Sequence, residues 1–153
     1  IAVLRGVTKF FAVPGLRLAY AIMNNPEYMS IINITNTPDN ISTLTAIACT
    51  ELFKDFSYVT RSRSQIFTER NLIYSAMVTN KNLKLYKPYA NFMLAKLLKE
   101  DVSASSVAAN CNLKGIIIKN CTDIRGLDDR YIRFCFMNPR QNDLLVNTIL
   151  EQL

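Results

Sequence analysis

The sequence contains no histidine in its 153 residues. This absence excludes a serine or cysteine nucleophile paired with a histidine base within the chain. The four cysteines form no C-x-x-C pair, so no zinc or other metal site is expected. Their spacing does not indicate a disulfide framework either, and a reducing, cytoplasmic location is therefore expected. The cysteines are Cys49, Cys111, Cys121 and Cys135.

Long apolar runs are also missing. No run approaches the roughly 18 residues that suggest a membrane span, and mean hydropathy is only +0.10, so no membrane association is predicted. The opening run Ile1–Leu4 lacks a basic region and a small-residue cleavage site, which favours a strand over a signal peptide. A chain whose first residues already lie in a strand is expected to be part of something longer.

The charge is mildly basic, with 18 Lys and Arg against 12 Asp and Glu and a net charge of +6. Arg61 and Arg63 form the tightest cluster, and Lys81, Lys84 and Lys87 a looser one. A nucleic-acid-binding protein would carry a basic stripe interleaved with aromatic residues. None is visible, so no nucleic-acid partner is predicted, and the basic excess fits an enzyme with small anionic substrates.

The N-terminal third has the pattern of strands followed by helices. Residues 2–7 are predicted to form a buried strand, and a second strand, 16–23, follows the Pro14–Gly15 turn. Asn25 is expected to cap a short helix from Pro26 to about residue 32. A helix over 39–54 is expected next. Its predicted apolar face consists of Ile41, Leu44, Ile47, Ala48 and Leu52.

A long amphipathic helix is predicted from about Phe56 to Val78. After residue 80, strands are expected at 83–86, 91–98, 116–118 and 131–136, with the third of these buried. A serine at 103, 105 or 106 would cap a helix to about residue 110, and Pro139 would open the last helix. The expected core contacts of the long helix are Val59, Ile66, Leu72, Ile73 and Met77, and those of the last helix are Leu144, Leu145, Ile149 and Leu153.

These elements predict three parts. Residues 1–55 would be the end of a larger sheet-based domain, and 56–79 a bridging helix. Residues 80–153, with the order β-β-α-β-β-α, would be a compact small α/β domain.

The segment from Thr8 to Tyr20 carries the candidate chemistry: Thr-Lys-Phe-Phe-Ala-Val-Pro-Gly-Leu-Arg-Leu-Ala-Tyr. Lys9 at the end of a buried strand would be partly desolvated, which favours the neutral, nucleophilic amine. The Pro14–Gly15 reversal can return Arg17 to its side, and a guanidinium suits a phosphate. An amine that forms an imine beside a phosphate-binding arginine is what pyridoxal phosphate requires. The simpler alternative is a lysine and an arginine flanking a surface turn.

This segment resembles the Schiff-base segment of class I and II aminotransferases, and within them the branch of histidinol-phosphate aminotransferases and threonine-phosphate decarboxylases. Pro14 favours the decarboxylases. Three further stretches resemble the same branch in the same order, namely 89–92, 119–121 with 126–134, and 142–145. The resemblance therefore runs the whole length of the chain. It implies an aspartate aminotransferase-like α/β fold, represented by the end of the large domain and the C-terminal small domain.

The resemblance also implies residue roles. Lys9 would hold pyridoxal 5'-phosphate as a Schiff base and then move protons, while Arg17, with help from Thr8, would bind the cofactor phosphate. Arg133 would bind the substrate's α-carboxylate. Lys119 would supply a second anion contact, unless it is a solvated charge at a strand end. A homodimer is implied for the full-length enzyme.

Two departures from the family pattern concern the cofactor. Gly6 replaces the serine or threonine that relatives usually carry three residues before the lysine, and Ala19 replaces a glycine. Both the acid that pairs with the pyridine nitrogen and the residues that stack on the ring lie upstream of the lysine in the family, so this piece alone is expected to be a poor catalyst. Transamination and decarboxylation both remain open. The alternative is a non-catalytic regulatory or structural domain descended from such an enzyme, which the intact Lys9, Arg17 and Arg133 oppose.

Overall fold

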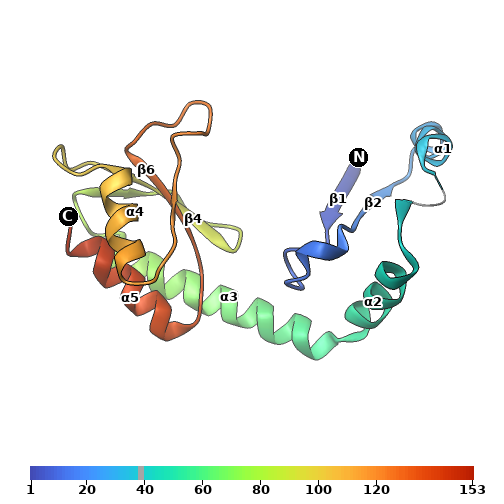
Figure 1. Cartoon of the computed structure of the whole chain (residues 1–153), viewed down its shortest axis with the longest axis horizontal. Coiled ribbons are helices and arrows are strands. Elements are labelled where there is room, and N and C mark those ends of the chain that lie inside the picture. The colour runs from blue at the N-terminus through green and yellow to red at the C-terminus, as the bar shows by residue number, and fades with distance from the viewer. Residues whose placement is uncertain (38–39) are drawn as a thin grey trace. The chain divides into compact units, whose positions relative to one another are not determined.

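The backbone was followed in a computed structural model that describes residues 1–37 and 40–153. The chain divides into two units, Ile1–Val59 and Thr60–Leu153, with the boundary inside the long helix α3 (Phe56–Met77) (Figure 1). The helices that the structure describes are too short or too polar to cross a membrane.

The first unit begins with an antiparallel ribbon of β1 (Ala2–Gly6) and β2 (Ala19–Met23). Both strands were predicted, but β2 begins later because η1 (Pro14–Leu16) is a 3₁₀ turn and Arg17 has a left-handed backbone, with φ 48°. The prediction of a buried first strand is wrong, since every residue of β1 is exposed. A two-stranded ribbon has no covering layer of its own, and its apolar side chains therefore remain accessible.

The helix α1 (Pro26–Thr35) starts as predicted and ends three residues later than expected. Asn25 is its N-cap, and its Oδ1 accepts hydrogen bonds from the backbone N–H groups of Glu27 (2.9 Å) and Tyr28 (3.2 Å). This confirms the predicted cap.

The helix α2 (Thr43–Lys54) is shorter than predicted. Residue 39, the expected start, lies outside the described residues, and the helix begins after the N-cap Ser42, whose Oγ accepts from Thr45 N–H at 3.1 Å. The predicted apolar face is wrong for Ile41, Leu44 and Ile47, which are exposed. Its other two residues, Ala48 and Leu52, are half-buried, and the buried residues are Thr45 and Cys49. The helix packs through the Thr45 side, where Thr45 Oγ1 donates to the Leu16 carbonyl at 3.3 Å.

The helix α3 confirms the predicted long helix. Glu69, Ile73 and Met77 are its buried residues, and their spacing of four places them on one face. Leu72 was expected in the core but is 60% exposed, because it lies one position away from this stripe. Val59 and Ile66 are half-buried.

The second unit contains a four-stranded antiparallel sheet in the order β3-β4-β6-β5. Helix α4 follows β4 and α5 follows β6, which confirms the predicted β-β-α-β-β-α order. Ser103 is the cap of α4, one of the three serines proposed for that role. The bounds are β3 (Leu83–Leu85), β4 (Phe92–Leu97), α4 (Ala104–Leu113), β5 (Lys119–Asn120), β6 (Tyr131–Cys135) and α5 (Pro139–Leu150).

The third predicted strand of this unit is displaced. A strand was expected over 116–118, but β5 spans Lys119–Asn120. Gly115, with φ 77°, follows the end of α4, and Ile116 N–H donates back to the Cys111 carbonyl at 2.9 Å. The isoleucines 116–118 therefore form a connection, in which Ile117 is 86% exposed while its two neighbours are buried.

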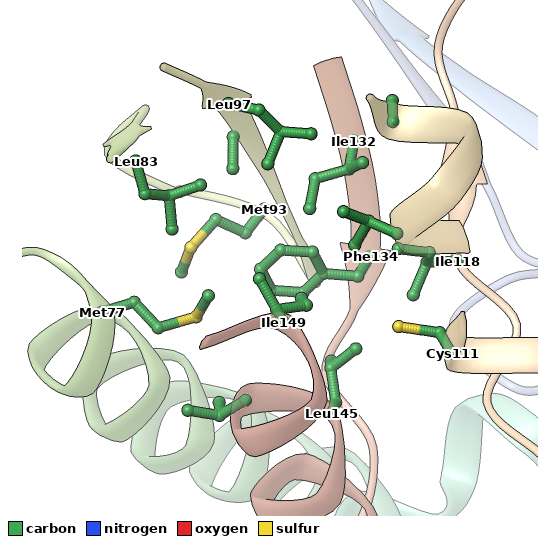
Figure 2. Close-up of a cluster of buried hydrophobic side chains, with 14 of the residues drawn as sticks. Met77, Leu83, Met93, Leu97, Cys111, Ile118, Ile132, Phe134, Leu145 and Ile149 are labelled. Atoms are coloured by element: carbon green, nitrogen blue, oxygen red, sulfur yellow. The ribbon is translucent and has the colours of Figure 1, made fainter. Parts of the chain in front are cut away.

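The core of this unit lies between one face of the sheet and the helices. Alternate strand residues Met93, Ala95 and Leu97 of β4 and Ile132 and Phe134 of β6 point into it. Phe134 lies at the centre of the cluster (Figure 2), among side chains from α3, α4 and α5. The intervening residues of both strands lie on the opposite face of the sheet.

The helix α5 contributes Leu145 and Ile149 to the core, as predicted, but Leu144 is 40% exposed. Asn142 is buried in its place. Its Oδ1 accepts from Met137 N–H at 2.8 Å, and its Nδ2 donates to Glu69 Oε2 at 2.7 Å. The amide thus joins the start of α5 to α3.

Candidate functional site

The predicted cofactor residues lie together at one end of the β1–β2 ribbon. The ladder continues beyond β1 through Val7 N–H, which donates to the Leu18 carbonyl at 3.0 Å. The same register places Thr8 opposite Arg17, and the Thr8 carbonyl accepts from Val13 N–H at 2.9 Å, which closes the loop. The reversal therefore returns the backbone of Arg17 to the end of the ribbon that carries Thr8 and Lys9.

Lys9 does not have the surroundings predicted for it. It lies three residues after the end of β1, in a turn, and its side chain is exposed. The expected desolvation by a buried strand is absent because that strand is itself exposed. Within this unit the Lys9 amine is accessible to a carbonyl compound. The next two residues, Phe10 and Phe11, pack their rings against the ring of Tyr58. The Tyr58 hydroxyl also donates a hydrogen bond to the Phe10 carbonyl at 2.9 Å.

Arg17 has a left-handed backbone, which costs a non-glycine residue roughly 1–2 kcal/mol. Arg17 also lines an open depression of about 330 Å³, to which Thr8 and Lys9 do not contribute. The wall also contains the polar side chains of Asn36, Thr37 and Asn40, alongside the backbone and apolar groups of Leu18, Ala19 and Ile41. Thr37 Oγ1 donates to Asn40 Oδ1 at 2.8 Å and Asn40 Nδ2 donates to Asn36 Oδ1 at 3.2 Å, so the guanidinium of Arg17 is the group of this wall that can bind an anion. Strained backbone is concentrated at ligand-binding positions in proteins.

Gly6 stands in open space. A Cβ built on it would meet no atom within 4 Å, so the serine or threonine expected from the family would fit without rearrangement. Thr8 is half-buried and is the nearest hydroxyl in sequence to Lys9.

The predicted substrate residues form a second cluster, in the second unit. Lys119 of β5 pairs directly with Arg133 of β6, and both lie on the sheet face opposite the core. This confirms that Arg133 points away from Ile132 and Phe134. Its guanidinium carbon lies 5.2 Å from the centroid of the Phe92 ring.

The two cations of this cluster differ in their partners. Lys119 Nζ binds Asp123 Oδ2 at 2.6 Å, and this contact holds the pKa of the Asp123 carboxyl below its usual range. Arg133 makes no ion pair with any carboxylate of the described residues. Arg133 is therefore the cation of the pair that is free for an added anion.

Cys121 lies next to this cluster and is fully buried. Burial raises the pKa of its thiol, an effect that the charges of Arg133 and Lys119 only partly oppose. A protonated, enclosed thiol is a packing group and not a nucleophile.

Two further cations, Lys84 and Lys96, lie on the same sheet face. The sequence placed Lys84 in a loose basic cluster but did not reveal that it lies beside Lys96. They pair with each other across β3 and β4, and Lys96 also pairs with Tyr131 of β6. The period-two alternation of Phe92, Leu94 and Lys96 was the available signal.

Comparison with known proteins gives a consistent picture. The family model described as aminotransferase class I and II matches residues 1–149. Threonine-phosphate decarboxylase of Salmonella typhimurium is 29% identical over 153 residues, covering all of this chain and 41% of that protein. Histidinol-phosphate aminotransferase of Clostridium acetobutylicum superposes with a TM-score of 0.86 at 30% identity, covering 97% of this chain and 44% of that one.

A more distant structure carries a cofactor derivative. The α-aminoadipate aminotransferase LysN of Thermus thermophilus, complexed with N-(5'-phosphopyridoxyl)-L-leucine, superposes with a TM-score of 0.72 at 16% identity, over 99% of this chain and 42% of that one. The chain spans about two fifths of the length of the curated relatives it matches.

Proposed function

Because this chain belongs to the class I and II aminotransferases, we propose that it supplies the cofactor lysine and the substrate arginine of a pyridoxal-phosphate-dependent enzyme. The predicted family and its α/β fold are confirmed by the match over residues 1–149 and by the superposition on a solved histidinol-phosphate aminotransferase. The proposed substrate is a phosphorylated or acidic amino compound, as the names of the relatives suggest.

The observation that carries the proposal is the position of Thr8, Lys9 and Arg17 at one end of the ribbon, with Arg17 lining the open depression. These residues fit pyridoxal phosphate: an accessible amine for its aldehyde, a guanidinium for its phosphate and a nearby hydroxyl. When bound, the cofactor supplies an electron sink for the bond that breaks at the substrate's Cα.

The chain's own residues divide the remaining tasks. Lys9 Nζ would attach the cofactor covalently and afterwards accept or return a proton at Cα. Arg17 would hold the phosphate, and Arg133 would bind the substrate's carboxylate with two parallel N–H donors. The cation–π contact with Phe92 would orient that guanidinium.

Two reactions fit this arrangement. Transamination breaks the Cα–H bond and decarboxylation breaks the Cα–carboxylate bond, so the outcome depends on how Arg133 poses the carboxylate. The relatives include both kinds of enzyme.

The exposed Lys9, Arg17 and unpaired Arg133 favour an enzyme over a non-catalytic descendant. We further place the enzyme in the cytoplasm, as a homodimer acting on a small molecule.

Arg133→Lys tests the substrate assignment. In the full-length enzyme the variant keeps the charge but loses the paired donors, so KM for a carboxylate-bearing substrate is expected to rise at least tenfold, a loss of about 1.4 kcal/mol or more. The dissociation constant of the cofactor should not change. Arg140→Lys, at an exposed position of α5, is the matched control and should leave KM unaltered. An unchanged KM together with weaker cofactor binding in Arg133→Lys would assign Arg133 to the cofactor and refute this role.

A further inference from the structure

A second group of basic residues lies on the same sheet face as Arg133, one row along the strands. Lys84 of β3 pairs with Lys96 of β4, and Lys96 pairs with Tyr131 of β6. Tyr86, two residues after Lys84, completes this cluster of Lys84, Tyr86, Lys96 and Tyr131. No residue of the cluster is assigned to the cofactor or to the substrate carboxylate.

The cluster places like charges side by side. Directly opposed residues of an antiparallel pair lie close together, and like charges there are destabilising. Neither Lys84 nor Lys96 forms an ion pair with a carboxylate of the described residues. An uncompensated pair of ammonium groups at this position points to an anion from outside the described chain.

The aromatic rings hold the two ammonium groups in place. Lys84 Nζ lies 5.3 Å from the Tyr86 ring centroid, and Lys96 Nζ lies 5.2 Å from the Tyr131 ring centroid. The two rings stack, with centroids 6.4 Å apart and planes inclined by 27°. The cations are therefore arranged before any ligand arrives, which reduces the entropic cost of binding.

The donor set favours one class of anion. Two ammonium groups and one remaining phenol hydroxyl suit a group with about two negative charges and three acceptor oxygens, which is a phosphate monoester. A carboxylate, with one charge and two oxygens, is better matched by the paired donors of Arg133. The side chain of Tyr131 raises the pKa of Tyr86, chiefly by hydrogen bonding, so one hydroxyl proton of this tyrosine pair is shared between the two rings.

We propose that Lys84, Tyr86, Lys96 and Tyr131 form a binding site for a phosphate monoester, separate from Arg133 and from the cofactor loop. Residues two apart on a strand are separated by roughly 6.6–6.8 Å. That spacing matches a small molecule with a carboxylate at one end and a phosphate at the other. The phosphate can belong to the substrate held by Arg133 or to a separate phosphorylated compound.

The test is a titration of the 153-residue chain with inorganic phosphate, without pyridoxal phosphate and at constant ionic strength. The ring resonances of Tyr86 and Tyr131 report this cluster and not the Arg17 depression, which can also attract phosphate. The double variant Lys84→Gln, Lys96→Gln is expected to weaken the phosphate affinity read from these resonances at least tenfold. Lys87→Gln is the matched control, because Lys87 also lies over a tyrosine ring but outside the strands. Its affinity should stay within twofold of the parent.

The thermal midpoint of each variant separates loss of the site from loss of the fold. Without phosphate, the double variant should melt within a few degrees of the parent, because the repulsion that it removes and the two cation–π contacts that it loses offset each other. Equal affinities of parent and double variant, or an equal loss in Lys87→Gln, would overturn the proposal by showing general electrostatic attraction only. If the double variant melts lower than that, the single variant Lys96→Gln is used with the same criterion.

A second titration identifies the source of the phosphate, and only this arm rests on the proposed function. If the site holds the substrate's own phosphate, O-phospho-L-threonine should bind more tightly than inorganic phosphate, and Arg133→Lys should remove the difference. If the phosphate comes from a separate compound, the two probes should bind equally and Arg133→Lys should change neither. Both results support the site. Failure of Lys9 to bind the cofactor would disprove the proposed function and leave the inorganic phosphate result unaffected.

Discussion

Arg17 has a strained backbone and lines the open depression. A left-handed conformation is unfavourable for arginine, and glycine would adopt it freely. Ala12 of the same loop is also left-handed, with φ 55°, so the strain belongs to the loop, and the proposed phosphate contact would be the reason for an arginine at position 17. Substitutions of Arg17 should therefore change the free energy of unfolding and the cofactor affinity independently of each other.

Arg17→Gly and Arg17→Ala provide that separation. Both delete the guanidinium and should weaken cofactor binding by about 2–4 kcal/mol, the range for losing one partner of a charge-assisted contact. The glycine variant also relieves the left-handed strain, so it should be about 1 kcal/mol more stable than the alanine variant. Urea unfolding followed by circular dichroism gives the stabilities, and cofactor titration gives the affinities. Equal stabilities would show that the backbone at Arg17 is not strained.

At single residues, the sequence indicated which residues are candidates for the site better than it indicated how buried they are. Thr8, Lys9 and Arg17 were proposed from a local motif, and the backbone pairing of the ribbon puts Thr8 and Arg17 at the same end of it. The exposure of Lys9 was not foreseen, because burial depends on layers that a local pattern does not contain. Arg133 was oriented correctly because a strand of period two fixes which face each side chain takes.

Among the elements, α5 is joined to α3 by a buried hydrogen bond. Asn142 is 2% exposed and Glu69 is 6% exposed, and the amide also contacts both backbone groups of Met137. Met137 follows β6, so the network fixes the connection that leaves the strand of Arg133. Both polar side chains lie at positions where an apolar pattern predicts core leucines or isoleucines.

Asn142→Ala should destabilise the second unit by about 2–4 kcal/mol, because it leaves the Glu69 carboxylate buried without its donor. Glu69→Gln should cost less than about 1 kcal/mol, since the glutamine carbonyl can still accept from Asn142. Chemical unfolding of the two variants measures the difference. If Glu69→Gln proved as costly as Asn142→Ala, the charge and not the hydrogen bond would hold the helices together.

The accuracy of element prediction followed the strength of the local signal. Caps and proline starts located α1 and α5, and alternation located β4 and β6. The apolar run 116–118 was assigned to a strand, but a strand needs a partner, and the ladder instead forms at Lys119 and Asn120. The face of α2 was assigned from its leucines and isoleucines, yet the contact that forms is made by Thr45.

In the molecule as a whole, the two units differ in how many of their residues are buried. Thr60–Leu153 contains a continuous apolar core, whereas Val7, Thr45 and Cys49 are the buried residues that the structure describes in Ile1–Val59. Apolar side chains of the first unit are exposed on its ribbon and helices. Examples are Leu4, Ile22, Ile34, Ile41, Leu44 and Ile47.

Limited trypsin digestion should therefore cut the first unit first, at Lys9, Arg17 or Lys54, since sparsely packed segments open locally at low cost. A fragment that begins within α3 and ends at Leu153 should persist, as mass spectrometry of the time course would show. Early cuts at Lys96 or Arg133, in the sheet, would contradict this distribution of stability.

Strand pairing brings together residues of the proposed phosphate site that are far apart in the sequence. Lys84 and Lys96 are separated by 11 intervening residues in the chain, and strand pairing alone makes them neighbours. The basic and aromatic residues that appear scattered in sequence share one sheet face for the same reason. No local motif contains this information, because it depends on register.

The central claim is that Lys9 is the cofactor lysine, and covalent trapping tests it most directly. The protein is incubated with pyridoxal phosphate, reduced with borohydride, digested and mapped by mass spectrometry. The account predicts that the phosphopyridoxyl group is found on Lys9 in preference to every other lysine, that Arg17→Ala reduces the yield, and that Lys9→Ala abolishes it while the exposed control Lys54→Ala does not. Labelling spread evenly over the surface lysines, or retained at full yield in Lys9→Ala, would contradict it.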